Sequence, residues 1–122
     1  MQTKILRYDK EREYFFREGC FINELSNTEE DPQLSIARVR VEPGDCTKWH
    51  LLEDRAERYL ILQGTGEVEI GDMAPAGLKA WDLVLIPAGI RQRIRNTGTN
   101  DLVFVALCTP RFTEEAYREL SD

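Results

Sequence analysis

A histidine and a glutamate seven positions apart are the first residues of this chain whose types and spacing suggest chemistry. His50 is the only histidine, and Glu57 follows it across a short polar segment, 53–55. Strand-forming residues on either side of that segment predict paired strands at 48–52 and 57–63. Such a pair would bring the imidazole and the carboxylate together. A histidine beside a carboxylate can hold a metal ion, or can donate and accept protons near neutral pH.

Two further polar residues are expected beside this pair. Side chains alternate between the faces of a strand, so Tyr59 would share the face of Glu57. Residues 90–95 also alternate, which places Gln92 on one face and arginines on the other. If His50, Glu57 and Gln92 all face inward, they converge in a mainly apolar cavity, the usual anatomy of a small-molecule site. We therefore expect Tyr59 and Gln92 to bind the ligand.

The chemistry of these residues leaves three functions open. In the first, His50, Glu57 and Gln92 hold one divalent metal ion, such as Mn, Fe, Ni or Zn, through an oxygen-rich set with one imidazole. In the second, no metal is bound, and Glu57 favours the charged form of His50, so that the two are catalytic acid–base residues. In the third, His50 is a structural residue of a barrel that binds a ligand without catalysis. Burying Glu57 without a partner would cost on the order of several kcal/mol, so the pair requires an explanation.

The flanking segments predict an antiparallel β barrel. Short alternating or apolar runs, separated by turns rich in glycine and proline, predict strands between about residues 13 and 109. The runs 83–86 and 102–108 are apolar on both faces, so we expect both to be buried on both sides. Residues 113–120 predict a helix, because Thr113 can cap it and glutamates occupy its first turn.

The composition fits one globular domain over residues 1–122. A chain of 122 residues suits a single domain, and 42% hydrophobic with 31% charged residues argues against disorder. The net charge of −6 disfavours nucleic acid and anionic membranes, because both are bound through basic surfaces. No apolar run approaches the ~20 residues that span a bilayer. Cys20, Cys46 and Cys108 form no CxxC pair, and the first residues lack an apolar signal segment, so we expect reduced thiols and a cytoplasmic location.

Two stretches of the chain resemble the sequence motifs of the cupin family. Gly44, His50, Glu57 and Gly64 match the first motif, G-x5-H-x-H-x3,4-E-x6-G, and Pro87, Gly89 and Asn96 match the second, G-x5-P-x-G-x2-H-x3-N. Leu52 and Gln92 stand where the motifs have histidines, and Trp81 replaces the opening glycine of the second motif. In metal-binding cupins three histidines and the glutamate hold the ion. This chain keeps one histidine and the glutamate, and Gln92 could offer a carbonyl oxygen.

The resemblance implies an all-β fold, a cupin-type double-stranded β-helix (jelly-roll barrel) with a short C-terminal helix. It also implies that the barrel binds a small polar molecule, with a divalent metal and isomerase- or oxygenase-like activity. The alternatives are a non-catalytic ligand-binding or sensing module, and a metal-free isomerase or epimerase that uses His50 and Glu57. Cupins of this size commonly pair through sheet edges, so the resemblance further implies a homodimer.

Overall fold

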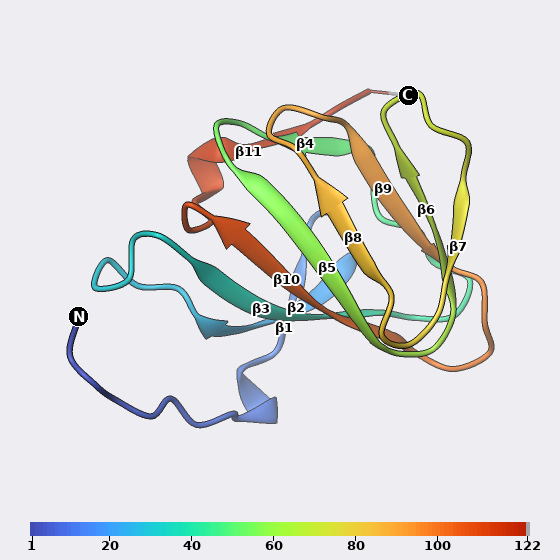
Figure 1. Ribbon diagram of the computed structural model, residues 1–122. Helices are drawn as coiled ribbons and strands as arrows, with labels where there is room; N and C mark the ends of the chain where they lie inside the picture. Colours follow the sequence, from blue (N-terminus) through green and yellow to red (C-terminus); the bar gives the residue numbers. More distant parts are fainter. Residues whose placement is uncertain (122) are drawn as a thin grey trace.

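Two antiparallel sheets face each other and form a barrel (Figure 1). The computed structural model describes residues 1–121, so Asp122, the last residue of the predicted domain, lies outside it. The six-stranded sheet has the order β1-β2-β3-β10-β5-β8, and the five-stranded sheet has the order β11-β4-β9-β6-β7. The strands are β1 (Tyr14–Phe16), β2 (Cys20–Ser26), β3 (Ser35–Val41), β4 (His50–Leu52), β5 (Ala56–Gln63), β6 (Gly66–Ile70), β7 (Ala76–Leu78), β8 (Leu83–Ile86), β9 (Gln92–Asn96), β10 (Leu102–Thr109) and β11 (Tyr117–Glu119). Two 3-10 turns, η1 (Lys10–Arg12) and η2 (Glu114–Ala116), complete the secondary structure of residues 1–121, and no helix there is long and apolar enough to cross a membrane.

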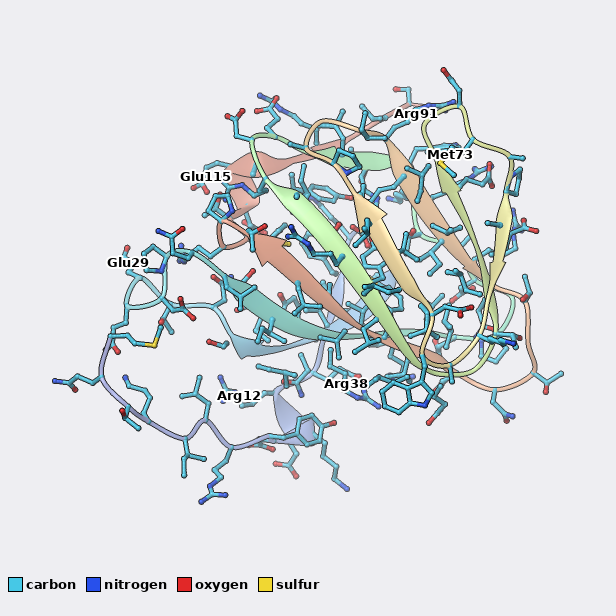
Figure 2. The ribbon with its side chains drawn as sticks, in the orientation of Figure 1. Arg12, Glu29, Arg38, Met73, Arg91 and Glu115 are labelled. Atoms are coloured by element: carbon cyan, nitrogen blue, oxygen red, sulfur yellow. The ribbon has the colours of Figure 1, made fainter. Side chains whose placement is uncertain are left out.

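The core lies between the sheets because the strands turn their apolar faces inward. In β5 the buried residues Glu57, Tyr59 and Ile61 alternate with more exposed neighbours, as the sequence pattern predicts. The same alternation buries Gln92, Ile94 and Asn96 of β9. Figure 2 shows the side chains of Arg91 and Glu115 at the outside of the barrel. Each fully buried aliphatic or aromatic side chain contributes roughly 1.5–3 kcal/mol, so this inner layer is the main source of stability.

The strands that carry His50 and Glu57 do not pair with each other, so the predicted hairpin is wrong. Strand β4 lies beside β9 and β11 in the five-stranded sheet, whereas β5 lies between β10 and β8 in the other sheet. The segment 53–55 carries the chain from one sheet to the other, and Asp54 adopts a left-handed backbone with φ 59° at this crossing. The two side chains therefore come from opposite walls of the barrel.

The apolar strand β8 is also exposed on one face, which corrects the prediction of two-sided burial. Leu83 and Leu85 are 57% and 65% exposed, whereas Val84 and Ile86 point into the core. The reason is that β8 is an edge strand, whereas the N-terminal residues Asp9 and Glu13 contact the outer face of the same sheet only at β2 and β3. Strand β10 lies in the middle of the same sheet, and its outward residues are buried (Val103) or half-buried (Val105 and Leu107). A partner chain on this face, as in a homodimer, stays a prediction.

The predicted C-terminal helix is reduced to the single turn η2, and strand β11 follows it. Thr113 makes no capping hydrogen bond through its side chain. Tyr117 pairs with Leu52 and Glu119 pairs with His50, so β11 extends the five-stranded sheet beside β4. An isolated helix of this length is marginal, and the backbone hydrogen bonds of the sheet outcompete it. The consequence for the site is that Tyr117 is held against His50.

Candidate functional site

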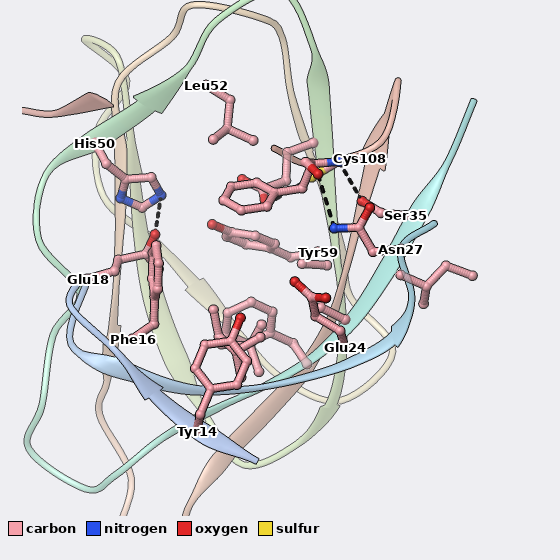
Figure 3. A pocket seen from close by; sticks show the side chains of 18 residues that line it. Tyr14, Phe16, Glu18, Glu24, Asn27, Ser35, His50, Leu52, Tyr59 and Cys108 are labelled. Atoms are coloured by element: carbon pink, nitrogen blue, oxygen red, sulfur yellow. Dashed lines mark hydrogen bonds and ion pairs between the residues drawn. The ribbon is translucent and has the colours of Figure 1, made fainter. Parts of the chain in front are cut away.

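A cavity between the two sheets collects most of the polar residues that the sequence singles out (Figure 3). His50, Glu57 and Tyr59 line it, together with Glu18 and a wall of apolar and aromatic side chains. The centres of water-sized molecules can occupy about 50 Å³ of it. A single water needs roughly 10–15 Å³ on this measure, so the cavity has room for a small ligand group. Gln92 lies behind this wall, where it is bonded to two of the lining residues.

His50 is held by hydrogen bonds at both ring nitrogens. Its Nδ1 lies 2.7 Å from the backbone oxygen of Lys48, and its Nε2 lies 3.1 Å from Glu18 Oε1. The ring of Tyr117 stacks on the imidazole with a centroid distance of 5.4 Å. With only 2% of His50 exposed, the orientation of the ring is fixed by its neighbours.

These contacts determine how many protons His50 and Glu18 carry together. A carbonyl oxygen only accepts hydrogen bonds, so Nδ1 of His50 carries a hydrogen and donates it to Lys48. A neutral ring in this tautomer would turn the lone pair of Nε2 toward the lone pairs of Glu18. The 3.1 Å contact therefore requires a further proton, either on the imidazole or on the carboxyl group. His50 and Glu18 thus share one transferable proton at the wall of the cavity.

Glu18 is the site residue that sequence reasoning missed. It lies in the turn between β1 and β2, and its backbone oxygen accepts a hydrogen bond of 2.8 Å from Lys48. Its second carboxylate oxygen accepts a bond of 3.4 Å from the Cys20 thiol. Gly19 follows with φ 104°, a backbone conformation that suits glycine. The only sequence signal was this turn, because no spacing rule links residue 18 to His50. The carboxylate that lies beside the His50 ring is therefore that of Glu18, whereas the sequence predicted Glu57.

Glu57 belongs instead to a buried network with Gln92 and Tyr59. Gln92 Nε2 donates to Glu57 Oε1 at 2.8 Å, and the Tyr59 hydroxyl donates to Gln92 Oε1. The Cys108 thiol lies 3.6 Å from Glu57 Oε2 as a weak donor. This network explains how Glu57 can be buried, because both of its carboxyl oxygens have hydrogen-bond partners.

Burial raises the pKa of Glu57 above its ordinary value. The charge of His50 opposes this rise, and the charge of Glu18 adds to it. Desolvation dominates because a carboxylate loses its hydration in the barrel interior, which favours the neutral acid. Burial also raises the pKa of the Cys108 thiol, so this sulfur is held in its protonated form. Cys46 lies apart from the cavity, and its backbone forms a single antiparallel β-bridge with Arg95.

The predicted metal ligands are not oriented for a metal ion. Gln92 turns its amide nitrogen, which cannot bind a cation, toward Glu57, and its oxygen is engaged by Tyr59. The Nε2 atom of His50 faces Glu18 rather than the Glu57–Gln92 network. Leu52 fills its motif position with a buried apolar side chain. No group of three or more His, Cys, Asp or Glu side chains in residues 1–121 is arranged to hold a metal ion. The donor chemistry of the set therefore does not fit the ion that the family resemblance implies.

Comparison with known proteins identifies the family. Residues 37–108 match the cupin domain family, and the chain belongs to it. An oxalate-binding protein of Thermotoga maritima is 36% identical over 73 residues, which span 59% of this chain and 59% of that protein. The structure of KdgF from a Halomonas species superimposes with a TM-score of 0.77 at 19% identity, over 89% of this chain and 96% of that one. Pac13, a nucleoside dehydratase, superimposes with a TM-score of 0.78 at 22% identity, over 97% of this chain and 92% of that one. The double-stranded β-helix fold predicted from the sequence is confirmed.

Proposed function

We propose that this cupin binds a small polar molecule in its barrel and transfers protons to and from it without a metal ion. The observation that carries the proposal is the 3.1 Å contact between Nε2 of His50 and Oε1 of Glu18 at the cavity wall, which requires a shared proton. A transferable proton on a buried, oriented pair is what general acid–base catalysis requires. The orientation of Gln92 toward Glu57 disfavours the metal-dependent alternative.

In the proposed mechanism Glu18 contacts the ligand and His50 supports it. The Glu18 side chain is 13% exposed and the His50 side chain only 2%, so the carboxylate is the more accessible partner. His50 receives or returns the proton through Nε2, while its Nδ1 hydrogen stays on the Lys48 oxygen. This arrangement keeps the imidazole in one tautomer through the reaction.

Glu57, on β5 of the six-stranded sheet, supplies the complementary acid. Its raised pKa favours the protonated form, and two carboxyl groups with different environments can take opposite roles in one reaction. The Glu18–His50 pair removes a proton from a carbon next to a carbonyl group, and Glu57 protonates the carbonyl oxygen to give an enol. Return of one proton to carbon and release of the other to Glu57 yields an isomer or epimer. No oxidant, reductant or co-reactant is needed.

The comparisons support a small-molecule function of this general kind. One relative is named for binding oxalate, and one barrel of the same fold is a nucleoside dehydratase. Loss of water from a substrate is also an acid–base reaction. The chain spans 59% of the length of the oxalate-binding relative, so its ligand is taken here only as a precedent for a small polar molecule.

Deuterium exchange tests this function. A panel of small hydroxyaldehydes, hydroxyketones and keto sugars is incubated with the protein in D₂O and followed by NMR. Incorporation of deuterium next to the carbonyl is expected in the wild type. It should fall by roughly 10²-fold or more in Glu18→Gln, as for loss of a general base. Glu115→Gln is the matched control, since it changes an exposed glutamate outside the barrel. Binding without exchange would instead favour a non-catalytic module.

A further inference from the structure

We infer that the cavity accepts neutral or cationic hydrogen-bond donors and rejects carboxylates and phosphates. This inference rests on the proposed function, because it names the class of molecule that the same cavity binds. Three glutamates line the cavity: Glu18, Glu24 and Glu57. No arginine or lysine is among the 18 described residues that line it. Among these lining residues only His50 can carry a positive charge, and its Nε2 is already engaged by Glu18, so it is not available to pair with an anionic ligand.

Nearby arginines are bonded elsewhere and do not supply the missing charge. Arg55 donates to the backbone oxygen of Glu53, and also bonds the backbone oxygen of Arg111. Arg58 bonds Thr109. Because Arg58 lies on the outward face of β5, between the inward-facing Glu57 and Tyr59, it cannot also reach the cavity.

One hydroxyl and one thiol near the glutamates are already used as donors. The Tyr59 hydroxyl donates to Gln92, and the Cys20 thiol donates to Glu18. Tyr14 lies beside Glu24 at one side of the cavity, and burial together with this carboxylate raises the pKa of Tyr14 to about 12. Apart from the acid proton of Glu57, the groups that remain free to bind a ligand are mainly carboxylate oxygens of Glu18 and Glu24, each of which can accept further hydrogen bonds.

The remaining wall is apolar and aromatic. Phe16, Phe104 and Phe112 line the cavity beside the tyrosine rings. Such a wall binds the apolar face of a ligand, while the carboxylates accept from its hydroxyl or ammonium groups. A molecule with a ring or short carbon skeleton and several hydroxyl or amino groups fits both features. A dianion such as oxalate would instead place its charges beside the Glu24 carboxylate and the oxygens of Glu18, in an interior that screens them poorly.

Matched ligands that differ only in charge test this selectivity. The first set is glucose, glucosamine and glucuronate, and the second is benzyl alcohol, benzylamine and benzoate, with oxalate as an additional anion. Binding is followed by NMR of the cavity methyl groups of Ala37 and Ala106. In at least one set the neutral or cationic member is expected to bind about tenfold or more tightly than the anion, because like charges repel in the barrel.

Glu24→Gln should reduce the preference in binding affinity for neutral or cationic ligands over anions, because it removes one cavity charge that the proposed proton transfer does not use. Glu115→Gln is the control with the same change of charge on the outside, and should leave the preference unchanged. Should Glu24→Gln fail to fold, the preference of the wild type decides the question. Equal or tighter binding of an anion would overturn the inference and leave the proposed function standing. If no compound of either set shifts the cavity signals, the proposed function fails as well.

Discussion

Nε2 of His50 lies 3.1 Å from Oε1 of Glu18, across the gap between a strand of one sheet and a turn of the other. The contact joins residues that are 32 positions apart in the sequence. Because of this contact, His50 shares a proton with Glu18. The contact also occupies Nε2, the ring nitrogen that would otherwise be free to bind a metal ion.

Removing either partner of the pair should destabilise the protein. Glu18→Gln and His50→Gln are each expected to lower the free energy of unfolding by about 1–3 kcal/mol, because each leaves a buried polar group with a poorer partner. The double variant should lose less than the sum of the two, with a coupling energy of roughly 0.5–3 kcal/mol. Urea unfolding of the four proteins gives these values. Strict additivity would mean that the two side chains do not interact.

Stability should fall with rising pH because of Glu57. Its pKa is raised in the folded protein, so the folded state binds more protons than the unfolded state above the ordinary pKa of 4.5. This contribution is fully present below pH 4.5, and is lost as the pH rises through the folded-state pKa. Glu57→Gln removes the titration, and the amide oxygen can still accept from Gln92.

The measurement is the difference in unfolding free energy between wild type and Glu57→Gln from pH 4.5 to pH 8. The pH dependence of all other titrating groups is common to both proteins and cancels in this difference. The variant should gain relative to the wild type as the pH rises. A difference that is flat, or that changes in favour of the wild type, would show that the pKa of Glu57 is not raised.

Metal ions should not stabilise the wild type, but should stabilise a variant with restored ligands. Leu52→His and Gln92→His together recreate the three-histidine and glutamate set of metal-binding cupins. At a free metal concentration of 100 times the dissociation constant, binding would add about 2.7 kcal/mol. Thermal unfolding with and without Mn, Fe, Ni or Zn, and with EDTA, compares the two proteins. A clear rise in the melting temperature of the wild type would contradict the orientation described for Gln92.

Trp81→Gly should stabilise the protein. Trp81 adopts φ 75° where the family motif has glycine, and a left-handed backbone costs a residue with a side chain roughly 1–2 kcal/mol. The indole is 74% exposed, so little packing is lost with it. The turn itself is kept by the hydrogen bond of 2.7 Å from the Trp81 backbone nitrogen to the oxygen of Ile61. Part of the gain is offset by the larger conformational freedom of glycine in the unfolded chain, so we expect the free energy of unfolding to rise by about 1 kcal/mol or less. A loss of stability would assign a packing role to the indole.

The sequence predicted the inward faces of the strands better than their partners. Alternation correctly turned His50, Glu57 and Gln92 toward the interior, because side-chain parity is a local property of a strand. Pairing is not local, and the same pattern fits a hairpin as well as two strands in opposite sheets. The segment 113–120 has helical signals, but sheet hydrogen bonds beside β4 decide its structure.

The partner of His50 could not be predicted for the same reason. Glu18 reaches the cavity only because β1 and β2 form a hairpin at the edge of the six-stranded sheet, which brings their turn to Lys48 and His50. Sequence spacing relates residues within one motif, whereas this contact depends on closure of the barrel. The two motifs thus located the cavity, and the strand arrangement determined its chemistry.

The position of the shared proton is tested most directly by ¹⁵N and ¹H NMR of the His50 side chain, the only imidazole in the chain. We expect a protonated Nδ1, together with a downfield proton at the Nε2–Glu18 contact that is lost in Glu18→Gln. An unprotonated Nδ1, or an imidazole spectrum that Glu18→Gln leaves unchanged, would contradict it.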